Sequence, residues 1–242
     1  MVPITILQSA ADARPDWVNR CMTSVADWSQ RQGYHYHCIG DELFDWVTPE
    51  LRVKLHDRKP ILADLARLRW IESELAVRGG LVVWIDADSV VIDPTWRIPD
   101  STHTFFGEEC WVQPTAKGAW RAYQSPHNAF MGFTVASPVL GFLAYLSESI
   151  IERADAAHIA PQMVGPKLLK ALNNLAQFTL VPEAGAASPE LLAEWVGHAG
   201  PATACYEQST RLPLALVNLC SSLTHSEEAV KRAEQFLARH GA

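Results

Sequence analysis

The feature that most constrains the fold is a run of five apolar residues that ends in acidic residues. Leu81 to Ile85 is apolar at every position and is followed directly by Asp86, Ala87 and Asp88. A strand without polar alternation is typical of a central strand that is covered on both faces of an α/β sheet. Ligands of open α/β sheets bind at the carboxyl ends of the strands. We therefore expect the two carboxylates at a ligand-binding edge.

The segments before this run have the order of an α/β fold. Residues 4–8 read as a short buried strand and residues 34–39 as a second strand rich in aromatic residues. The helical apolar period between them starts at Pro15 and ends at Gly33. This is one βαβ unit, which predicts a right-handed crossover between parallel strands. A second helix, with apolar residues on one stripe, is expected from Pro60 to Gly79.

The second part of the chain predicts more elements with weaker patterns. Residues 101–127 read as a loop-like excursion rich in aromatic residues, and residues 182–189 as a mobile loop. We expect strands over 129–135, 178–181 and 214–219, and helices over 139–153 and 167–175. The spacing of Thr224 and Glu227 predicts a capping box at the start of a final helix.

Composition excludes several classes of protein. The chain has 242 residues, 48% of them hydrophobic, and a formal net charge of −7, so it has no surplus of basic residues with which to bind nucleic acid in general. Neither a signal-peptide pattern nor about 18 consecutive apolar residues is present, so we expect no transmembrane segment and a cytoplasmic location. The five cysteines contain no C-x-x-C pair, which favours free thiols.

The acidic pair has a chemistry of its own. Because side chains alternate along a strand, Asp86 and Asp88 are expected to point the same way. Two such carboxylates repel each other unless a cation lies nearby, and Mg²⁺ or Mn²⁺ bound to a diphosphate is a suitable partner. The alternative is a polar strand end, with an Asx turn at Asp88 and a second turn at Asp93-Pro94.

Several motifs together resemble a known family. Asp64-Leu65-Ala66-Arg67, then a helix, Gly79-Gly80, the apolar strand and Asp86-Ala87-Asp88 resemble the DXD sugar-binding region of GT-A glycosyltransferases. The resemblance is greatest to the group related to glycosyltransferase family 32 and to capsular polysaccharide and toxin glycosyltransferases. Further similarity lies in Ile6-Leu7-Gln8, Asn128-Ala129-Phe130-Met131 and Gly165-Pro166.

The resemblance implies a fold and an activity. The fold would be a single GT-A-type domain over residues 1–242, with a Rossmann-like mixed, mostly parallel central sheet and helices on both faces. Residues 1–100 would form the nucleotide-sugar-binding half, and residues 101–242 the acceptor side and C-terminal helix. The activity would be metal-dependent transfer of a sugar from a nucleotide sugar, UDP-linked, with retention of anomeric configuration, to an acceptor that the sequence does not identify.

The resemblance also implies roles for single residues. Asp88 would bind Mn²⁺ or Mg²⁺ directly, and Asp86 would contact the nucleotide ribose or a water on the metal. Four residues compete for the place of the third ligand: Asn218, Ser221, Ser222 and His225. The donor would contact the following residues: Gln8, Asp64, Arg67, Asp86, Ala87 and Asn128.

Ordinary structural interpretations remain beside these roles. Asp64 and Arg67 are neighbours on a helix and could present an acceptor and a donor to sugar hydroxyls, or form an exposed ion pair, and Arg69 competes with Arg67. Trp111 and Trp120 could stack on a sugar or seal a core edge. His225 could reach a diphosphate at the helix start or lie on the surface.

Two other functions are compatible with the same sequence motif. Asp86 to Val90 also matches the D-x-D-x-[TV] nucleophile loop of haloacid-dehalogenase-type phosphatases, although that loop usually follows the first strand of the domain. A non-catalytic nucleotide-sugar-binding protein would keep the fold and tolerate the loss of metal ligands.

Overall fold

The computed structural model describes residues 2–56, 58–99, 103–155, 158–160, 162–210 and 212–240. The strands are β1 (Ile4–Ser9), β2 (His35–Ile39), β3 (Leu81–Ile85), β4 (Ser89–Val91), β5 (Thr104–Pro114), β6 (Trp120–Thr134), β7 (Thr179–Val181), β8 (Ala184–Ala186) and β9 (Leu216–Asn218). The helices are α1 (Asp16–Gln32), α2 (Pro49–Lys54), α3 (Lys59–Arg78), α4 (Leu140–Arg153), α5 (Pro166–Ala176), α6 (Pro189–Val196), α7 (Pro201–Ser209) and α8 (Glu227–His240), with 3₁₀ turns η1 (Asp41–Trp46) and η3 (Ser221–Leu223).

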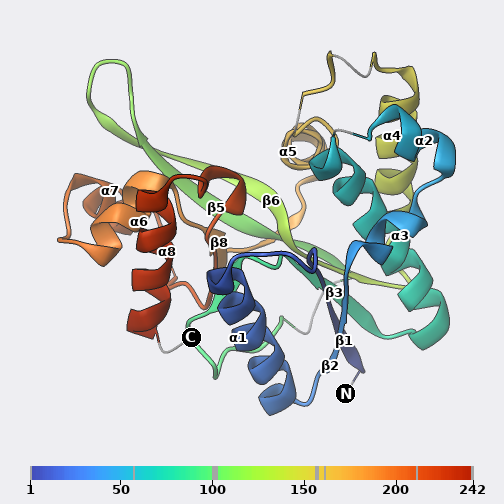
Figure 1. Ribbon diagram of the computed structural model, residues 1–242, viewed down its shortest axis with the longest axis horizontal. Coiled ribbons are helices and arrows are strands. Elements are labelled where there is room, and N and C mark those ends of the chain that lie inside the picture. Colours follow the sequence, from blue (N-terminus) through green and yellow to red (C-terminus); the bar gives the residue numbers. More distant parts are fainter. Residues whose placement is uncertain are drawn as a thin grey trace.

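The fold is a mixed α/β structure around a mostly parallel central sheet (Figure 1). The six strands follow the order β2-β1-β3-β6-β5-β7. The pairs β1–β2, β1–β3 and β5–β7 are parallel, whereas β6 is antiparallel to both β3 and β5. A second sheet of three short strands has the order β4-β9-β8. The expected fold class is confirmed.

Helices cover both faces of the central sheet because its inner strands are apolar on both sides. Leu7 and Val82 pack in one cluster with residues of α3 and α4. Ile6 and Val83, one position along each strand, pack in another cluster with Trp28 of α1. The unbroken apolar run of β3 is therefore fully buried, as its sequence predicts.

One edge of the sheet collects chain segments that are distant in sequence. The carboxyl ends of the parallel strands β1 and β3 lie together, and Phe130 of β6 pairs with Ile85 at the end of β3. Helix α3 leads directly into β3, so its first half lies beside the end of that strand. This arrangement brings parts of α3, β3 and β6 to one place.

The region expected as a loop over residues 101–127 is mostly a hairpin, and this prediction was wrong. Residues 101 and 102 lie outside the described residues, and Thr104 to Pro114 pairs with β6 from Phe133 back to Trp120. The outer half of β5 was missed because Cys110, Trp111 and Val112 are three consecutive apolar residues without polar alternation, although only Cys110 and Val112 share the buried face. Gly107 and Pro126, read as loop residues, lie within the paired strands.

Two smaller predictions were also wrong. The expected mobile loop over 182–189 contains β8, whose three residues are all buried, and Ser188, which caps α6 by accepting a hydrogen bond from Leu191 N. The expected Thr224 cap is absent because the Thr224 hydroxyl donates to the carbonyl groups of Leu219 and Cys220. Ser226 instead accepts a hydrogen bond from Ala229 N at the start of α8.

Two expectations from composition are consistent with the structure. All five cysteines are free thiols. Among the described residues, no helix combines the length and the apolar character that crossing a membrane requires.

Candidate functional site

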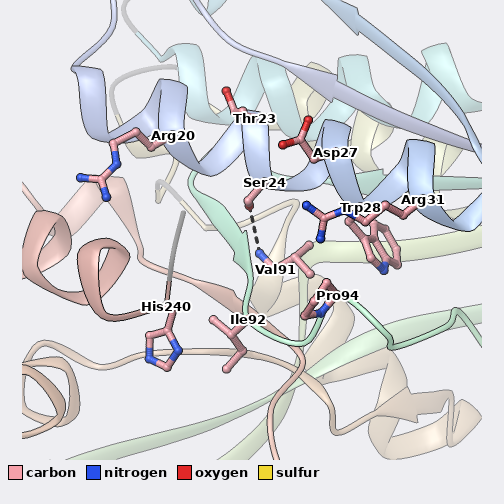
Figure 2. A pocket seen from close by; sticks show the side chains of 10 residues that line it. All are labelled: Arg20, Thr23, Ser24, Asp27, Trp28, Arg31, Val91, Ile92, Pro94 and His240. Carbon is pink, nitrogen blue, oxygen red and sulfur yellow. Dashed lines mark hydrogen bonds between the residues drawn. The ribbon is translucent and has the colours of Figure 1, made fainter.

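A small hollow of about 210 Å³ lies between α1 and the chain that follows β4 (Figure 2). Arg20 and Arg31 are among its lining residues, and Asp27 is the single carboxylate among those described. The Ser24 hydroxyl accepts a hydrogen bond from Val91 N (3.1 Å), which ties α1 to β4. Because the Ser24 hydroxyl is engaged in this packing contact, we do not assign the functional site to this hollow.

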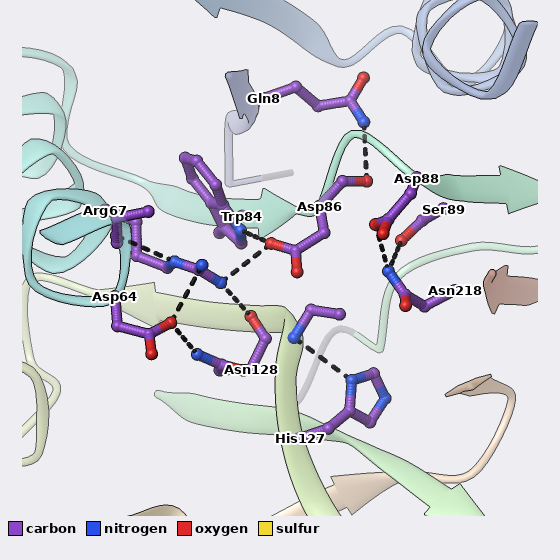
Figure 3. Close-up of polar contacts among 12 residues, drawn as sticks. Gln8, Asp64, Arg67, Trp84, Asp86, Asp88, Ser89, His127, Asn128 and Asn218 are labelled. Atoms are coloured by element: carbon purple, nitrogen blue, oxygen red, sulfur yellow. Dashed lines mark hydrogen bonds and ion pairs between the residues drawn. The ribbon is translucent and has the colours of Figure 1, made fainter. Parts of the chain in front are cut away.

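A much larger cleft of about 630 Å³ lies at the carboxyl end of β3, and its centre is drawn in Figure 3. This volume is within the roughly 300–1,000 Å³ typical of small-molecule sites. The described lining residues are Pro60, Asp64, Arg67, Asp86, Asp88, Glu109, Trp111, His127, Asn128, Ala129, Gln162, Pro166, Ala186, Asn218, Cys220, Ser221, Ser222 and Leu223. Six residues predicted from the sequence as donor or metal contacts are therefore brought together here: Asp64, Arg67, Asp86, Asp88, Asn128 and Asn218.

Arg67 is the centre of a polar network in this cleft (Figure 3). Its Nη1 atom donates to Asp86 Oδ1 (2.9 Å) and to the carbonyl oxygen of Asn128 (3.1 Å). Its Nη2 atom lies 3.0 Å from Asp64 Oδ1, and its guanidinium carbon lies 5.0 Å from the centre of the Trp84 ring. The alternative of an exposed ion pair is wrong, because Asp64 and Arg67 are each only 7% exposed.

Asp86 is held from three sides. Trp84 Nε1 donates to the same Oδ1 atom that Arg67 contacts (2.5 Å). Beneath the carboxylate, Gln8 Nε2 donates to the carbonyl oxygen of Asp86 (3.2 Å), and Gln8 Oε1 accepts from the Tyr36 hydroxyl (2.8 Å). Gln8 is fully buried and does not line the cleft, so it supports the position of Asp86 through the backbone of that residue.

Asp88 is held by the small second sheet. Asn218 Nδ2 donates to Asp88 Oδ1 (2.5 Å) and to the Ser89 hydroxyl (3.1 Å), and Ser221 N donates to Asp88 Oδ2 (2.6 Å). The Asn218 Oδ1 atom accepts from Cys220 N (2.9 Å). Asn218 therefore orients the carboxylate of Asp88 with its amide nitrogen, while its oxygen supports the turn that follows β9.

An irregularity in β6 places Asn128 in the cleft. Phe106 of β5 lies opposite Met131, but the next residue, Gly107, lies opposite His127, so residues 128–130 have no partner on β5. Such bulges re-aim side chains beside functional sites. Here Asn128 Nδ2 donates to Asp64 Oδ1 (2.7 Å).

Two close contacts fix the surroundings of this bulge. A Cβ atom added at Gly165 would lie 2.4 Å from Asp64 Oδ2 and 2.9 Å from Asn128 Nδ2. The His127 ring accepts a hydrogen bond from Ala129 N at Nδ1 and lies with Nε2 2.9 Å from the carbonyl oxygen of Ala184. These partners fit the neutral ring with its proton on Nε2.

The cleft is strongly acidic for a site that is expected to bind a diphosphate. Its described lining has four carboxylates, from Asp64, Asp86, Asp88 and Glu109, against the single guanidinium of Arg67, which leaves a formal charge of −3 with His127 neutral. Burial raises the pKa of Asp64 to about 6, although Arg67 and the Asn128 hydrogen bond partly offset it. Burial also raises the pKa of Asp86 despite the opposing effect of Arg67.

The residues of the cleft fit a divalent cation whose coordination shell is completed by a bound ligand. Among the described residues, no group of three or more His, Cys, Asp or Glu side chains is arranged to hold a metal ion. Mg²⁺, however, is commonly bound by one or two carboxylates together with substrate phosphates. Asp86 and Asp88 would supply such carboxylates, and the excess negative charge favours a cation between them and an anionic ligand.

Several predicted residues lie elsewhere. His225 is exposed and is not among the described lining residues, and Ala87 packs beside the cluster of α1 and α8 residues. Trp111 lines the cleft, whereas Trp120 packs against the cluster around Val112. Arg69, the competitor of Arg67, pairs with Glu72 and Glu148.

Sequence reasoning missed Glu109 and His127 among the lining residues, whereas Ser221 and Ser222 were already competitors for the third metal ligand. Glu109 had a usable signal, because it shares strand alternation with Trp111, but the segment was read as a loop. What the sequence does not reveal is that Ser221 meets Asp88 through its backbone N–H, a contact that depends on the pairing of β9 with β4.

Comparisons with known proteins give a structural likeness but no sequence match. No family model matches the sequence, and a search of curated proteins finds no match. Among solved structures, a crystal structure of a glycosyltransferase involved in the glycosylation of the major capsid of PBCV-1 is similar, with a TM-score of 0.49 and 10% sequence identity. The alignment covers 98% of this chain and 99% of that chain. At this level the likeness does not bear on activity, so the residues of the cleft must carry any functional assignment.

Proposed function

We propose that this chain is a metal-dependent glycosyltransferase of the GT-A type that transfers a sugar from a UDP-linked donor to an acceptor with retention of anomeric configuration. The observation that carries the proposal is the cleft at the end of β3, where Asp86 and Asp88 lie beside the network of Asp64, Arg67 and Asn128. Retention and the UDP nucleotide come from the sequence resemblance alone.

The acidic pair accounts for the diphosphate half of the donor. A cation bound by Asp86 and Asp88 would act as a Lewis acid on the departing diphosphate. Asp88 is oriented for this by Asn218 Nδ2 and Ser221 N, which occupy one side of each carboxylate oxygen. Each oxygen keeps a further lone pair for a metal ion.

The network around Arg67 accounts for the sugar half. Asp64 presents an acceptor, and Arg67 and Asn128 present donors, within one buried cluster. Sugar hydroxyl groups both donate and accept hydrogen bonds, so they match such a mixed set. In the transfer, the bond from the anomeric carbon to the phosphate oxygen breaks, the bond to the acceptor oxygen forms, and the acceptor proton passes to the leaving phosphate.

A mass-spectrometric screen of donor hydrolysis tests the proposal. We expect one or more UDP-sugars to be hydrolysed in the presence of Mn²⁺, with much slower reaction of GDP-sugars. Asp88→Asn should abolish the hydrolysis. Asp93→Asn is the matched control, because Asp93 forms a surface turn with Thr95 and does not line the cleft.

The same samples separate the two other functions. Hydrolysis of p-nitrophenyl phosphate that disappears in Asp86→Asn would replace the proposal with a phosphatase. Mn²⁺-dependent UDP binding without hydrolysis or transfer of any UDP- or GDP-sugar would replace it with a binding protein.

A further inference from the structure

One wall of the cleft is a face of the β5–β6 hairpin. Glu109 and Trp111 of β5 line the cleft. Glu108 and Cys110 alternate with them and line a separate hollow together with Tyr206. The two faces of β5 therefore look into different spaces, and the face toward the cleft carries a carboxylate and an indole ring.

The register extends this wall along the hairpin. Ser125 lies opposite Glu109, and Tyr123 lies opposite Trp111. Directly opposed residues of an antiparallel pair share one face of the sheet. We call Glu109, Trp111, Tyr123 and Ser125 the hairpin wall. Its outer part belongs to the hairpin that projects beyond the other strands in Figure 1.

Two contacts hold the wall in place. The Ser125 hydroxyl donates to Glu109 Oε1 (2.8 Å), which fixes the carboxylate and leaves Oε2 for another donor. The guanidinium carbon of Arg121 lies 5.0 Å from the centre of the Tyr123 ring. The Trp111 and Tyr123 side chains are both only partly buried, so ring surface is available to a ligand.

We propose that the acceptor is a saccharide of at least two rings that lies along the hairpin wall, an inference that rests on the proposed glycosyltransferase activity. A sugar ring has a C–H face, which suits an indole or phenol ring, and an edge of hydroxyl groups, which suits a carboxylate. Trp111 and Glu109 bind the ring nearest the donor inside the cleft. Tyr123, which is not among the described lining residues, binds the next ring outside it.

The chemistry of the wall favours a saccharide over a lipid. A lipid chain requires continuous apolar surface, whereas Glu109, Ser125 and Arg121 interrupt the two aromatic residues of this face. A peptide acceptor and a stacked nucleotide base are the remaining occupants, and the experiment below distinguishes them.

Saturation-transfer NMR with a saccharide panel tests the inference without knowledge of the donor sugar. The probes are methyl glycosides, the corresponding disaccharides and a serine- and threonine-containing peptide, each in the presence of UDP and Mn²⁺. We expect disaccharides to bind about tenfold more tightly than methyl glycosides, which corresponds to about 1.4 kcal/mol for one further stacked ring. The peptide should give no signal.

Variants assign the two subsites. Tyr123→Leu should remove the advantage of the disaccharide and leave methyl glycoside binding unchanged, while Tyr123→Phe should retain that advantage. Trp111→Leu should weaken both kinds of saccharide. Tyr145→Leu is the control, because this tyrosine is 59% exposed on α4 and has no place in the wall.

The outcomes separate this inference from the proposed function. Binding of the peptide in place of saccharides, equal affinity of Tyr123→Leu and the unaltered protein for disaccharides, or loss of UDP affinity in Trp111→Leu would overturn the saccharide subsite while leaving glycosyl transfer intact. Absence of Mn²⁺-dependent UDP binding by the unaltered protein would instead overturn the proposed function.

Discussion

Arg67 joins the parts of the cleft that come from three different elements. One guanidinium group contacts Asp64 of its own helix, Asp86 after β3 and the Asn128 carbonyl group of β6. Only a planar group with several donors can satisfy three acceptors and also lie against the Trp84 ring. A lysine at this position would keep the charge but lose this geometry.

Gly165 is required by the close approach of Asp64. Gly165→Ala should displace the Asp64–Asn128 pair, because the added Cβ atom would lie 2.4 Å from Asp64 Oδ2. We expect a loss of about 1–3 kcal/mol in the free energy of unfolding, measured with urea. Gly141→Ala is the matched control, since the nearest atom to its new Cβ is Glu72 Oε1 at 3.6 Å. Equal free energies of unfolding for the two variants would show that Asp64 and Asn128 accommodate the added methyl group without loss of stability.

Asp64 should make stability depend on pH in a particular direction. Its pKa is raised to about 6 in the folded protein, whereas an aspartate in the unfolded chain titrates near pH 4. Between these values the folded state binds more protons, so the contribution of Asp64 to the free energy of unfolding falls as the pH rises from about 4 to about 6. Urea unfolding at a series of pH values should show this fall in the unaltered protein relative to Asp64→Asn. Parallel curves for the two proteins would contradict the raised pKa.

At the scale of elements, the short strand β9 is what completes the site. It pairs antiparallel with β4 and parallel with β8, and it places Asn218 against Asp88. The 3₁₀ turn η3 follows β9 closely, and the backbone N–H of its first residue, Ser221, donates to the same carboxylate. The orientation of Asp88 therefore depends on about 130 residues of intervening chain being folded.

Asn218→Ala and His225→Ala separate two of the candidates for a third ligand. Asn218→Ala leaves Asp88 without one of its two hydrogen-bond donors, so we expect a loss of about 1–3 kcal/mol in stability and weaker Mn²⁺-dependent UDP binding. His225→Ala should change neither, because this exposed residue does not line the cleft. Thermal unfolding and UDP titration measure the two effects. Weaker UDP binding in His225→Ala alone would restore the histidine as a metal ligand.

Local signals were sufficient for one side of the cleft. The apolar run of β3, the acids that follow it and the helical spacing of Asp64 and Arg67 all lie within residues 64–88, and the structure brings them together. Trp111 of the hairpin wall was a sequence candidate although its strand was read as a loop, whereas β8 was missed for a physical reason. β8 consists of Ala-Gly-Ala, which has no strand-forming side chains, and it is a strand only because β9 pairs with it.

At the scale of the whole molecule, charge connects the cleft with its proposed ligand. The chain has a formal net charge of −7, and the four carboxylates and one guanidinium of the described cleft lining contribute −3 of this. A nucleotide diphosphate would be repelled by such a surface unless a cation accompanied it. The account therefore makes binding of the nucleotide conditional on the metal.

Calorimetric titration of UDP tests this central claim most directly. The unaltered protein should bind UDP in Mn²⁺ and not in excess EDTA. Asp88→Asn should weaken the Mn²⁺-dependent binding by at least about tenfold, the effect expected even for groups that only orient metal ligands, while Asp93→Asn should bind as the unaltered protein does. Equal affinity of Asp88→Asn and the unaltered protein, or UDP binding that is indifferent to the removal of Mn²⁺, would contradict the account.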